Sequence, residues 1–201
     1  MPREIEFLYD FGSPNAYFVH RAIPAIEAQG KVRFRYVPVL LGGIFKATGN
    51  QSPMQAYGHI AAKRDYDMLE IRRFIARHAI TGFTMNPHFP VNTLLMMRGA
   101  VAAETLGCAG VYAEAMFKGM WEQGLKLDDP EVWAACVSAA GLDAAALGAG
   151  AADPDNKARL VANTEAAVAR GVFGIPSFLL DGELWFGKDR LRDVVEAAQA
   201  G

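Results

Sequence analysis

Residues 4–17 read EIEFLYDFGSPNAY and carry the signals that decide the fold. Large apolar side chains at every second position from Ile5 to Tyr9 form the period-two pattern of a β-strand. A glycine turn ends this strand, and Ser13-Pro14 then supply a preferred N-cap and a preferred first residue of a helix. We therefore expect a strand over residues 4–10 and a helix directly after it.

The next segment extends this pair to a strand, helix and strand. Helical spacing continues to Gly30, and Pro24 is expected to kink or split the helix. Residues 31–39 alternate again and predict a second strand. Two strands joined by a helix of this length predict a parallel pair with a right-handed crossover.

The rest of the chain changes character twice. From Ser52 to about Ala169, apolar residues recur at three-and-four spacing, which predicts several helices joined by short loops. Strand signals return at residues 177–180 and 184–186, separated by the hairpin turn Asp181-Gly182, and a helix is expected from about residue 189 to 200. The predicted order is βαβ, a helical block, then ββα.

Composition narrows the classes of protein and of site. The 201 residues carry 20 Lys plus Arg against 22 Asp plus Glu, well mixed along the chain, so no basic surface for nucleic acid is expected. No apolar run approaches the roughly 18 residues of a membrane span, and acidic residues near Met1 argue against a secretory signal. We expect a cytoplasmic protein that forms one folding unit, with no membrane segment.

The metal-binding and redox residue types are sparse. Cys108 and Cys136 are not in a C-x-x-C pair and have no zinc-ligand spacing, so we expect buried small apolar residues. The four histidines lack the i, i+4 spacing of a helical metal site, and only His88 lies in a loop of interest. We expect no metal site.

Three positions could carry chemistry, and each has a plain structural interpretation. Ser13 can be only an N-cap, although a helix N-terminus also favours a thiolate or another anion beside it. Pro176 can be an ordinary edge-strand proline or a cis turn that exposes the backbone of Ile175 to a peptide-like ligand. Asp189 is by default the N-cap of the last helix.

Taken together, these positions resemble the thioredoxin-fold superfamily, in the DsbA-like branch that carries a helical insertion. The resemblance implies an α/β, thioredoxin-like fold (βαβ…ββα) in which residues 1–50 and 155–201 form the thioredoxin-like domain and residues 51–154 form an inserted helical domain. Where the oxidoreductases of this branch have C-x-x-C, this chain reads Ser13-Pro14-Asn15-Ala16. Disulfide exchange at that site is excluded because no attacking sulfur is present.

Four motifs resemble those of particular families within this branch. They are DFGSPNAY at 10–17, GNQSP at 49–53, NPHFP at 86–90 and GVFGIPSF at 171–178. In this order they resemble the 2-hydroxychromene-2-carboxylate isomerases and the related kappa-class glutathione transferases. The resemblance implies a homodimeric enzyme that uses glutathione as cofactor and acts on a small aromatic carboxylate.

The resemblance also implies roles for individual residues. The Ser13 hydroxyl would hydrogen-bond the glutathione sulfur, while the α-helix dipole helps to keep that sulfur as a thiolate. The other glutathione contacts implied are the backbone of Ile175 beside Pro176, Asn50, and, for the γ-glutamyl end, Lys188, Asp189 and Arg190. Lys46 is implied for the substrate carboxylate, and Asn86 with Pro87 for the wall of the aromatic site. Lys63 could assist at a carboxylate or be merely solvated.

The reaction implied belongs to aromatic, naphthalene-type catabolism. A thiolate that adds reversibly to a conjugated double bond allows rotation about that bond, which interconverts 2-hydroxychromene-2-carboxylate and trans-o-hydroxybenzylidenepyruvate. A kappa-type transferase, with the same thiolate and an external electrophile, is the nearest alternative. A further alternative is a catalytically inert DsbA-like binding module.

Overall fold

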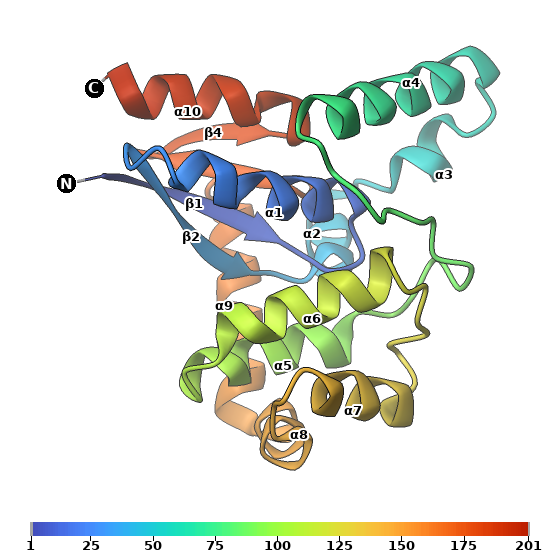
Figure 1. Ribbon diagram of the computed structural model, residues 1–201, viewed down its shortest axis with the longest axis vertical. Helices are drawn as coiled ribbons and strands as arrows, with labels where there is room; N and C mark the ends of the chain where they lie inside the picture. The colour runs from blue at the N-terminus through green and yellow to red at the C-terminus, as the bar shows by residue number, and fades with distance from the viewer. Residues whose placement is uncertain (1, 201) are drawn as a thin grey trace.

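The computed structural model describes residues 2–200, which form a four-stranded sheet surrounded by helices (Figure 1). The strands are β1 (Arg3–Tyr9), β2 (Val32–Pro38), β3 (Ser177–Leu180) and β4 (Glu183–Phe186). The helices are α1 (Pro14–Glu27), α2 (Leu41–Thr48), α3 (Pro53–Tyr57), α4 (Ala61–Arg77), α5 (Leu94–Thr105), α6 (Ala109–Trp121), α7 (Pro130–Ala139), α8 (Ala144–Ala152), α9 (Pro154–Ala169), the 3₁₀ turn η1 (Lys188–Arg190) and α10 (Leu191–Ala200).

The sheet has the strand order β2-β1-β3-β4. Strand β1 is parallel to β2 and antiparallel to β3, and β3 is antiparallel to β4. Phe7 lies opposite Tyr36 on one side and Phe178 on the other, with ring centroids 5.0 and 5.8 Å apart. This aromatic row fixes the register of β2, β1 and β3, because a slip of one residue would turn its side chains to the opposite face of the sheet.

Helices cover both faces of the sheet. Figure 1 shows α1 and α10 on one side of it and α9 on the other. Leu191, Val194 and Ala198 of α10 recur at helical spacing and are buried, as expected for an amphipathic helix packed on a sheet. Strand β1 therefore has helices over both faces, and its carboxyl end at Tyr9 leads into the interior of the protein.

Helices α5 to α8 form a block at one end of the sheet (Figure 1). The block is held by Tyr112, whose hydroxyl donates to the Met96 carbonyl at 2.9 Å and accepts from Trp133 Nε1 at 2.9 Å. Gly99 allows this approach, since a Cβ at that position would lie 2.2 Å from the Tyr112 oxygen. The close packing of α5 on α6 thus depends on a residue without a side chain.

The expected element order is confirmed, with three local differences. Helix α2 was not expected, since its Leu41-Gly42-Gly43 start reads as a loop. Helix α1 runs through Pro24, so of the two expected effects of this proline the split does not occur. The last helix begins with the 3₁₀ turn η1, whereas the hairpin turn is as expected, with φ of 51° at Asp181 and 88° at Gly182.

The division into a thioredoxin-like part and an inserted part, at residues 50/51 and 154/155, remains a proposal. Helix α4 lies near η1 in Figure 1, away from the α5–α8 block, and its Phe74 ring is 6.3 Å from that of Phe18 on α1. Helix α9 contacts α5 and α8 as well as α2 and β2. No helix within residues 2–200 has the length and apolar character needed to cross a membrane.

Candidate active site

The turn between β1 and α1 places Ser13 at the start of a helix in the interior of the protein. Ser13 is the N-cap of α1, where its Oγ accepts from the Ala16 N–H at 3.2 Å, and Pro14 is the first helical residue. No acidic residue lies in the first turn of α1. The positive end of the helix dipole at Ser13 is therefore not neutralised from within the helix.

The segment before β3 meets this serine. The Ile175–Pro176 peptide bond is cis, and the Ser13 hydroxyl donates to the Ile175 carbonyl at 3.2 Å, across 162 residues of sequence. The antiparallel pairing of β1 with β3 brings the two segments together, since Leu8 lies opposite Ser177. The Ile175 N–H has no hydrogen-bond partner within residues 2–200, so it can receive a ligand.

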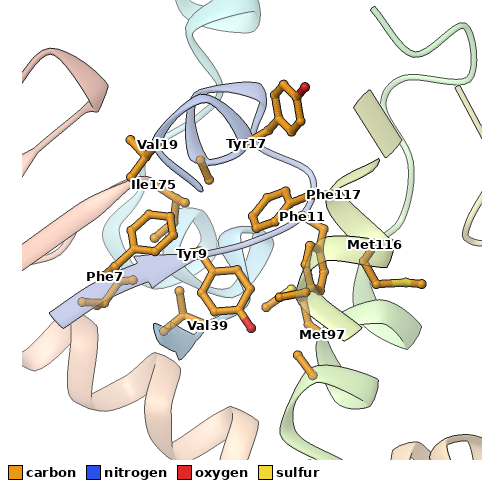
Figure 2. Close-up of a cluster of buried hydrophobic side chains, with 14 of the residues drawn as sticks. Phe7, Tyr9, Phe11, Tyr17, Val19, Val39, Met97, Met116, Phe117 and Ile175 are labelled. Atoms are coloured by element: carbon orange, nitrogen blue, oxygen red, sulfur yellow. The ribbon is translucent and has the colours of Figure 1, made fainter. Parts of the chain in front are cut away.

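The rest of the turn is anchored by side chains from other elements. The Phe11 carbonyl accepts from Trp121 Nε1 of α6 at 2.8 Å. The Phe11 ring lies 4.8 Å from Phe117 in an edge-on contact, and Figure 2 shows both rings in the buried cluster between β1 and the helical block. Ser13 is only 5% exposed. Its hydroxyl is thus held in a position largely shielded from bulk water.

A fully buried carboxylate completes the turn. Asp10 has no exposed surface, and its oxygens accept from Gly12 N–H at 2.9 Å, Leu41 N–H at 2.8 Å and the Thr93 hydroxyl at 3.1 Å. Burial raises the pKa of the Asp10 carboxyl, and the three hydrogen bonds act in the opposite direction. The motif DFGSPNAY includes Asp10, but nothing in one sequence indicates its partners at positions 41 and 93.

Asn50 links the end of α2 to the segment that holds Ile175. Its side-chain Nδ2 donates to the Phe173 carbonyl at 2.8 Å, and its Oδ1 accepts from the Gln51 N–H. Asn50 is exposed. The structure therefore brings Asn50 to the same edge of the site as Ile175.

The residues expected for the γ-glutamyl end follow on from Pro176. The Gly187 N–H donates to the Pro176 carbonyl at 2.9 Å, which places the turn η1 beside the Ile175–Pro176 segment. Lys188 is 4% exposed, and its Nζ lies 5.2 Å from the centre of the Phe74 ring and bonds the Asp189 carboxylate. Asp189 makes no capping hydrogen bond within residues 2–200, and its carboxylate pairs with Lys188 instead.

Asp189 also faces a cavity of about 310 Å³. The other residues that line it belong to α4 and are Glu70, Arg73, Phe74 and Arg77. Sequence reasoning did not include these α4 residues, because helical charges usually indicate a solvated face. Arg190, in contrast, turns toward α10 and pairs with Asp193.

The three residues expected around the substrate lie in different settings. Lys46 is exposed on the last turn of α2. Asn86 is 3% exposed, and its Nδ2 donates to the Met120 and Leu125 carbonyls at 2.9 Å each. Pro87 is exposed next to it. The Asn86 side chain is thus used to hold its own loop, which leaves Pro87 as the exposed member of that pair.

A family model, the DSBA-like thioredoxin domain, matches residues 4–199. The chain belongs to this family. The predicted thioredoxin-like α/β fold with helices between βαβ and ββα is thereby confirmed.

Relatives and solved structures point in the same direction. The chain is 28% identical over 189 residues to a 2-hydroxychromene-2-carboxylate isomerase of Pseudomonas sp. (strain C18), covering 93% of this chain and 86% of the relative. It is 26% identical over 212 residues to human glutathione S-transferase kappa 1, covering 95% and 88%. A solved 2-hydroxychromene-2-carboxylate isomerase superposes with a TM-score of 0.81 at 25% identity, over 96% and 93% of the two chains. The predicted resemblance is confirmed.

A solved structure of lower sequence identity shares the fold as well. A probable DsbA oxidoreductase of Streptomyces coelicolor superposes with a TM-score of 0.74 at 19% identity, over 98% of this chain and 88% of the other. In the present member of the family, the two cysteines lie in the helical block, Cys108 at the start of α6 and Cys136 on α7. Burial raises the pKa of the Cys136 thiol, so it is a poor nucleophile.

Proposed function

We propose that this protein is a glutathione-dependent isomerase that interconverts 2-hydroxychromene-2-carboxylate and trans-o-hydroxybenzylidenepyruvate. The observation that carries the proposal is Ser13, a buried hydroxyl donor at the N-terminus of α1 where redox members of the family would need a cysteine. The names of its isomerase relatives supply the reaction. The resemblance further supports a homodimer that acts in the cytoplasm, in the breakdown of aromatic compounds.

The residues around Ser13 fit glutathione. The Ile175 N–H lies next to Ser13 and lacks a partner within residues 2–200, as a peptide ligand requires. The cavity beyond it offers the Asp189 carboxylate for the γ-glutamyl ammonium. Arg77, which has no ion pair within the described part of the chain, offers a guanidinium for the γ-glutamyl carboxylate. Lys188 is buried beneath this surface, and the exposed Asn50 would contact another part of the tripeptide near Ile175.

Bound glutathione would supply a thiolate able to add to a conjugated double bond and leave again. Ser13 would donate its hydroxyl proton in a hydrogen bond to the sulfur after turning away from the Ile175 carbonyl. The N-terminus of α1 would stabilise negative charge at the same point. Both effects lower the thiol pKa and so raise the thiolate fraction at neutral pH.

The remaining expected residues would act on the substrate. Lys46 is an exposed cation suited to the substrate carboxylate, and Pro87 is an exposed, rigid surface suited to an aromatic ring. Asn86 would act indirectly, because its side-chain hydrogen bonds hold the loop that carries Pro87. The helical block that contains α5 and α6 would help to keep water out of the site.

A kappa-type transferase is the second candidate, and the similarity to human glutathione S-transferase kappa 1 is what favours it. It requires the same Ser13 and the same glutathione contacts, but an external electrophile replaces the chromene. An inert binding module requires neither and predicts no glutathione affinity.

The test is the isomerisation rate of 2-hydroxychromene-2-carboxylate, followed by ultraviolet absorbance with purified protein, with and without glutathione. A fast rate only in the presence of glutathione supports the proposal. Glutathione binding without isomerisation moves the assignment to the transferase, and the absence of both leaves the inert module. Ser13→Ala in the same assay checks that the rate depends on this site.

A further inference from the structure

The Asp10 carboxylate connects three segments that each carry part of the proposed site. Its bond to the Gly12 N–H lies in the turn that presents Ser13. Its bond to the Leu41 N–H lies at the start of α2, the helix that carries Lys46. Its bond to the Thr93 hydroxyl lies at the start of α5, directly after the loop that carries Pro87.

These three bonds use the carboxylate in a way that an amide cannot copy. Both oxygens accept, one from Gly12 and the other from Leu41 and Thr93. An asparagine has one accepting oxygen, and its NH₂ group would face at least one N–H or O–H donor. The cost of leaving such a buried donor unpaired makes a carboxylate at position 10 necessary for all three contacts.

Thr93 contacts the same turn in a second way. Its Cγ2 lies 3.0 Å from the point that a Cβ on Gly12 would occupy, so its methyl group packs against the glycine. The start of α5 is therefore both bonded to Asp10 and packed on the residue before Ser13. A displacement of α5 is transmitted directly to the reactive turn.

We propose that Asp10 is a positioning residue, which with Thr93 sets the distance between the thiol-binding turn and the substrate-binding elements α2 and α5. This inference rests on the proposed function and names a part of the machinery that touches neither glutathione nor substrate. Asp10 acts through Gly12, Leu41 and Thr93. Because reaction between two bound groups depends steeply on their separation, loss of one of these bonds is expected to slow the reaction more than it weakens binding.

The test uses four variants of the full chain. Thr93→Val removes the hydroxyl and keeps the shape, and Thr93→Ser keeps the hydroxyl. Thr164→Val is the matched control, since Thr164 is 8% exposed and its hydroxyl accepts from the Leu40 N–H at 3.0 Å, but it makes no bond to Asp10. Asp10→Asn replaces one of the two oxygens that accept from Gly12, Leu41 and Thr93 with an NH₂ group.

We expect Thr93→Val to lower kcat/KM for isomerisation about ten- to hundredfold, mainly in kcat, with glutathione affinity within about threefold of the wild type. Thr93→Ser should restore most of the rate. Thr164→Val loses the bond to the Leu40 N–H at the start of α2 but keeps all three bonds of Asp10, so it should lower the melting temperature while lowering kcat much less than Thr93→Val does. Equal kcat values for Thr93→Val and Thr164→Val would overturn the inference.

A second readout does not depend on activity. Amide hydrogen exchange in residues 10–16 and 40–44 should speed up in both Asp10→Asn and Thr93→Val, whereas Thr164→Val should leave residues 10–16 unchanged. Unchanged exchange in residues 10–16 of both site variants would overturn the positioning role. A wild-type protein without isomerase activity would instead reject the proposed function, and the exchange data would still decide the role of Asp10.

Discussion

Replacement of Ser13 by alanine removes one oxygen that makes two hydrogen bonds, and the two consequences can be separated. The Oγ accepts from the Ala16 N–H and donates to the Ile175 carbonyl. Loss of an N-cap costs about 1 kcal/mol, and the second bond adds on the order of 1 kcal/mol. For a chain of this length we expect the melting temperature to fall by roughly 2–8 °C.

The chemical consequence concerns the pKa of the bound glutathione thiol. A hydrogen bond to a charged group contributes about 1.5–3 kcal/mol, and one pKa unit corresponds to about 1.4 kcal/mol. The thiol pKa should therefore rise by about 1–2 units in Ser13→Ala. A more basic thiolate is also a better nucleophile, with a Brønsted slope of about 0.4–0.5, so the rate below the thiol pKa should fall only about three- to fifteenfold.

The assay is an ultraviolet titration of thiolate absorbance with saturating glutathione, together with the pH profile of kcat. Ser13→Gly also lacks the hydroxyl but keeps most of the capping preference, so it should show the pKa rise with a smaller loss of stability. Asp153→Ala removes another N-cap that precedes a proline, at the start of α9, and should change only stability. A thiol pKa in Ser13→Ala equal to that of the wild type would refute the role of Ser13.

Three further predictions concern other parts of the molecule. Asp189→Asn should weaken glutathione binding at least tenfold in calorimetry, because it removes the negative charge that faces the γ-glutamyl ammonium. It should lower the melting temperature less than Asp189→Ala, since the amide oxygen can still accept from the buried Lys188 ammonium. Unchanged glutathione affinity in Asp189→Asn would restore the N-cap interpretation. Glu6→Gln should lower the free energy of unfolding by up to about 1 kcal/mol at neutral pH. Arg170 lowers the pKa of Glu6, so the stabilisation by this ion pair is complete above the ordinary pKa range of glutamate and is lost as pH falls through the lowered pKa. If the variant still differed from the wild type in unfolding free energy at acidic pH, the ion pair would not be the cause. Gly99→Ala should lower the unfolding free energy by about 1–3 kcal/mol, since the new Cβ would displace the Tyr112 hydroxyl from its two partners; a neutral effect in chemical denaturation would mean that α5 and α6 can separate at no cost.

The parts of the fold that sequence predicts are those fixed by local patterns. The alternation in residues 4–9 and the turn at Asp181-Gly182 place β1 and the β3–β4 hairpin, because strand pleat and positive φ are properties of a few neighbouring residues. Helix α2 is different. Its start is supported by Leu40 N–H bonding Thr164 and by Leu41 N–H bonding Asp10, across 124 and 31 positions of sequence. No local pattern contains those partners, so two early glycines made the segment read as a loop.

The candidate site divides in the same way. Ser13 and Pro176 carry visible signals, a cap beside a proline and a proline at the start of a strand, yet each signal alone has an ordinary structural explanation. Only the resemblance joined them in advance, and the β1–β3 pairing is what brings Ser13 to Ile175. The roles of Asp10 and Thr93 were missed because a buried acceptor is recognised by its donors, which lie up to 83 positions away.

Asp10 also limits how a thiolate could be stabilised in this protein. A charged Asp10 lies three residues before Ser13 and would raise the pKa of a thiol bound there, since two like charges oppose each other. Its own raised pKa, caused by burial, is consistent with a poorly screened position. Activation of a bound thiol must then come from the Ser13 hydroxyl and the N-terminus of α1, and it must exceed the opposing effect of the carboxylate. The same carboxylate holds the turn, α2 and α5 together. Asp10 would therefore fix the geometry of the site while opposing the ionisation of a bound thiol. In the proposed function, the fold has no cysteine at the start of α1 and the thiol would arrive with the ligand, so we expect that thiol to need positioning as well as ionisation.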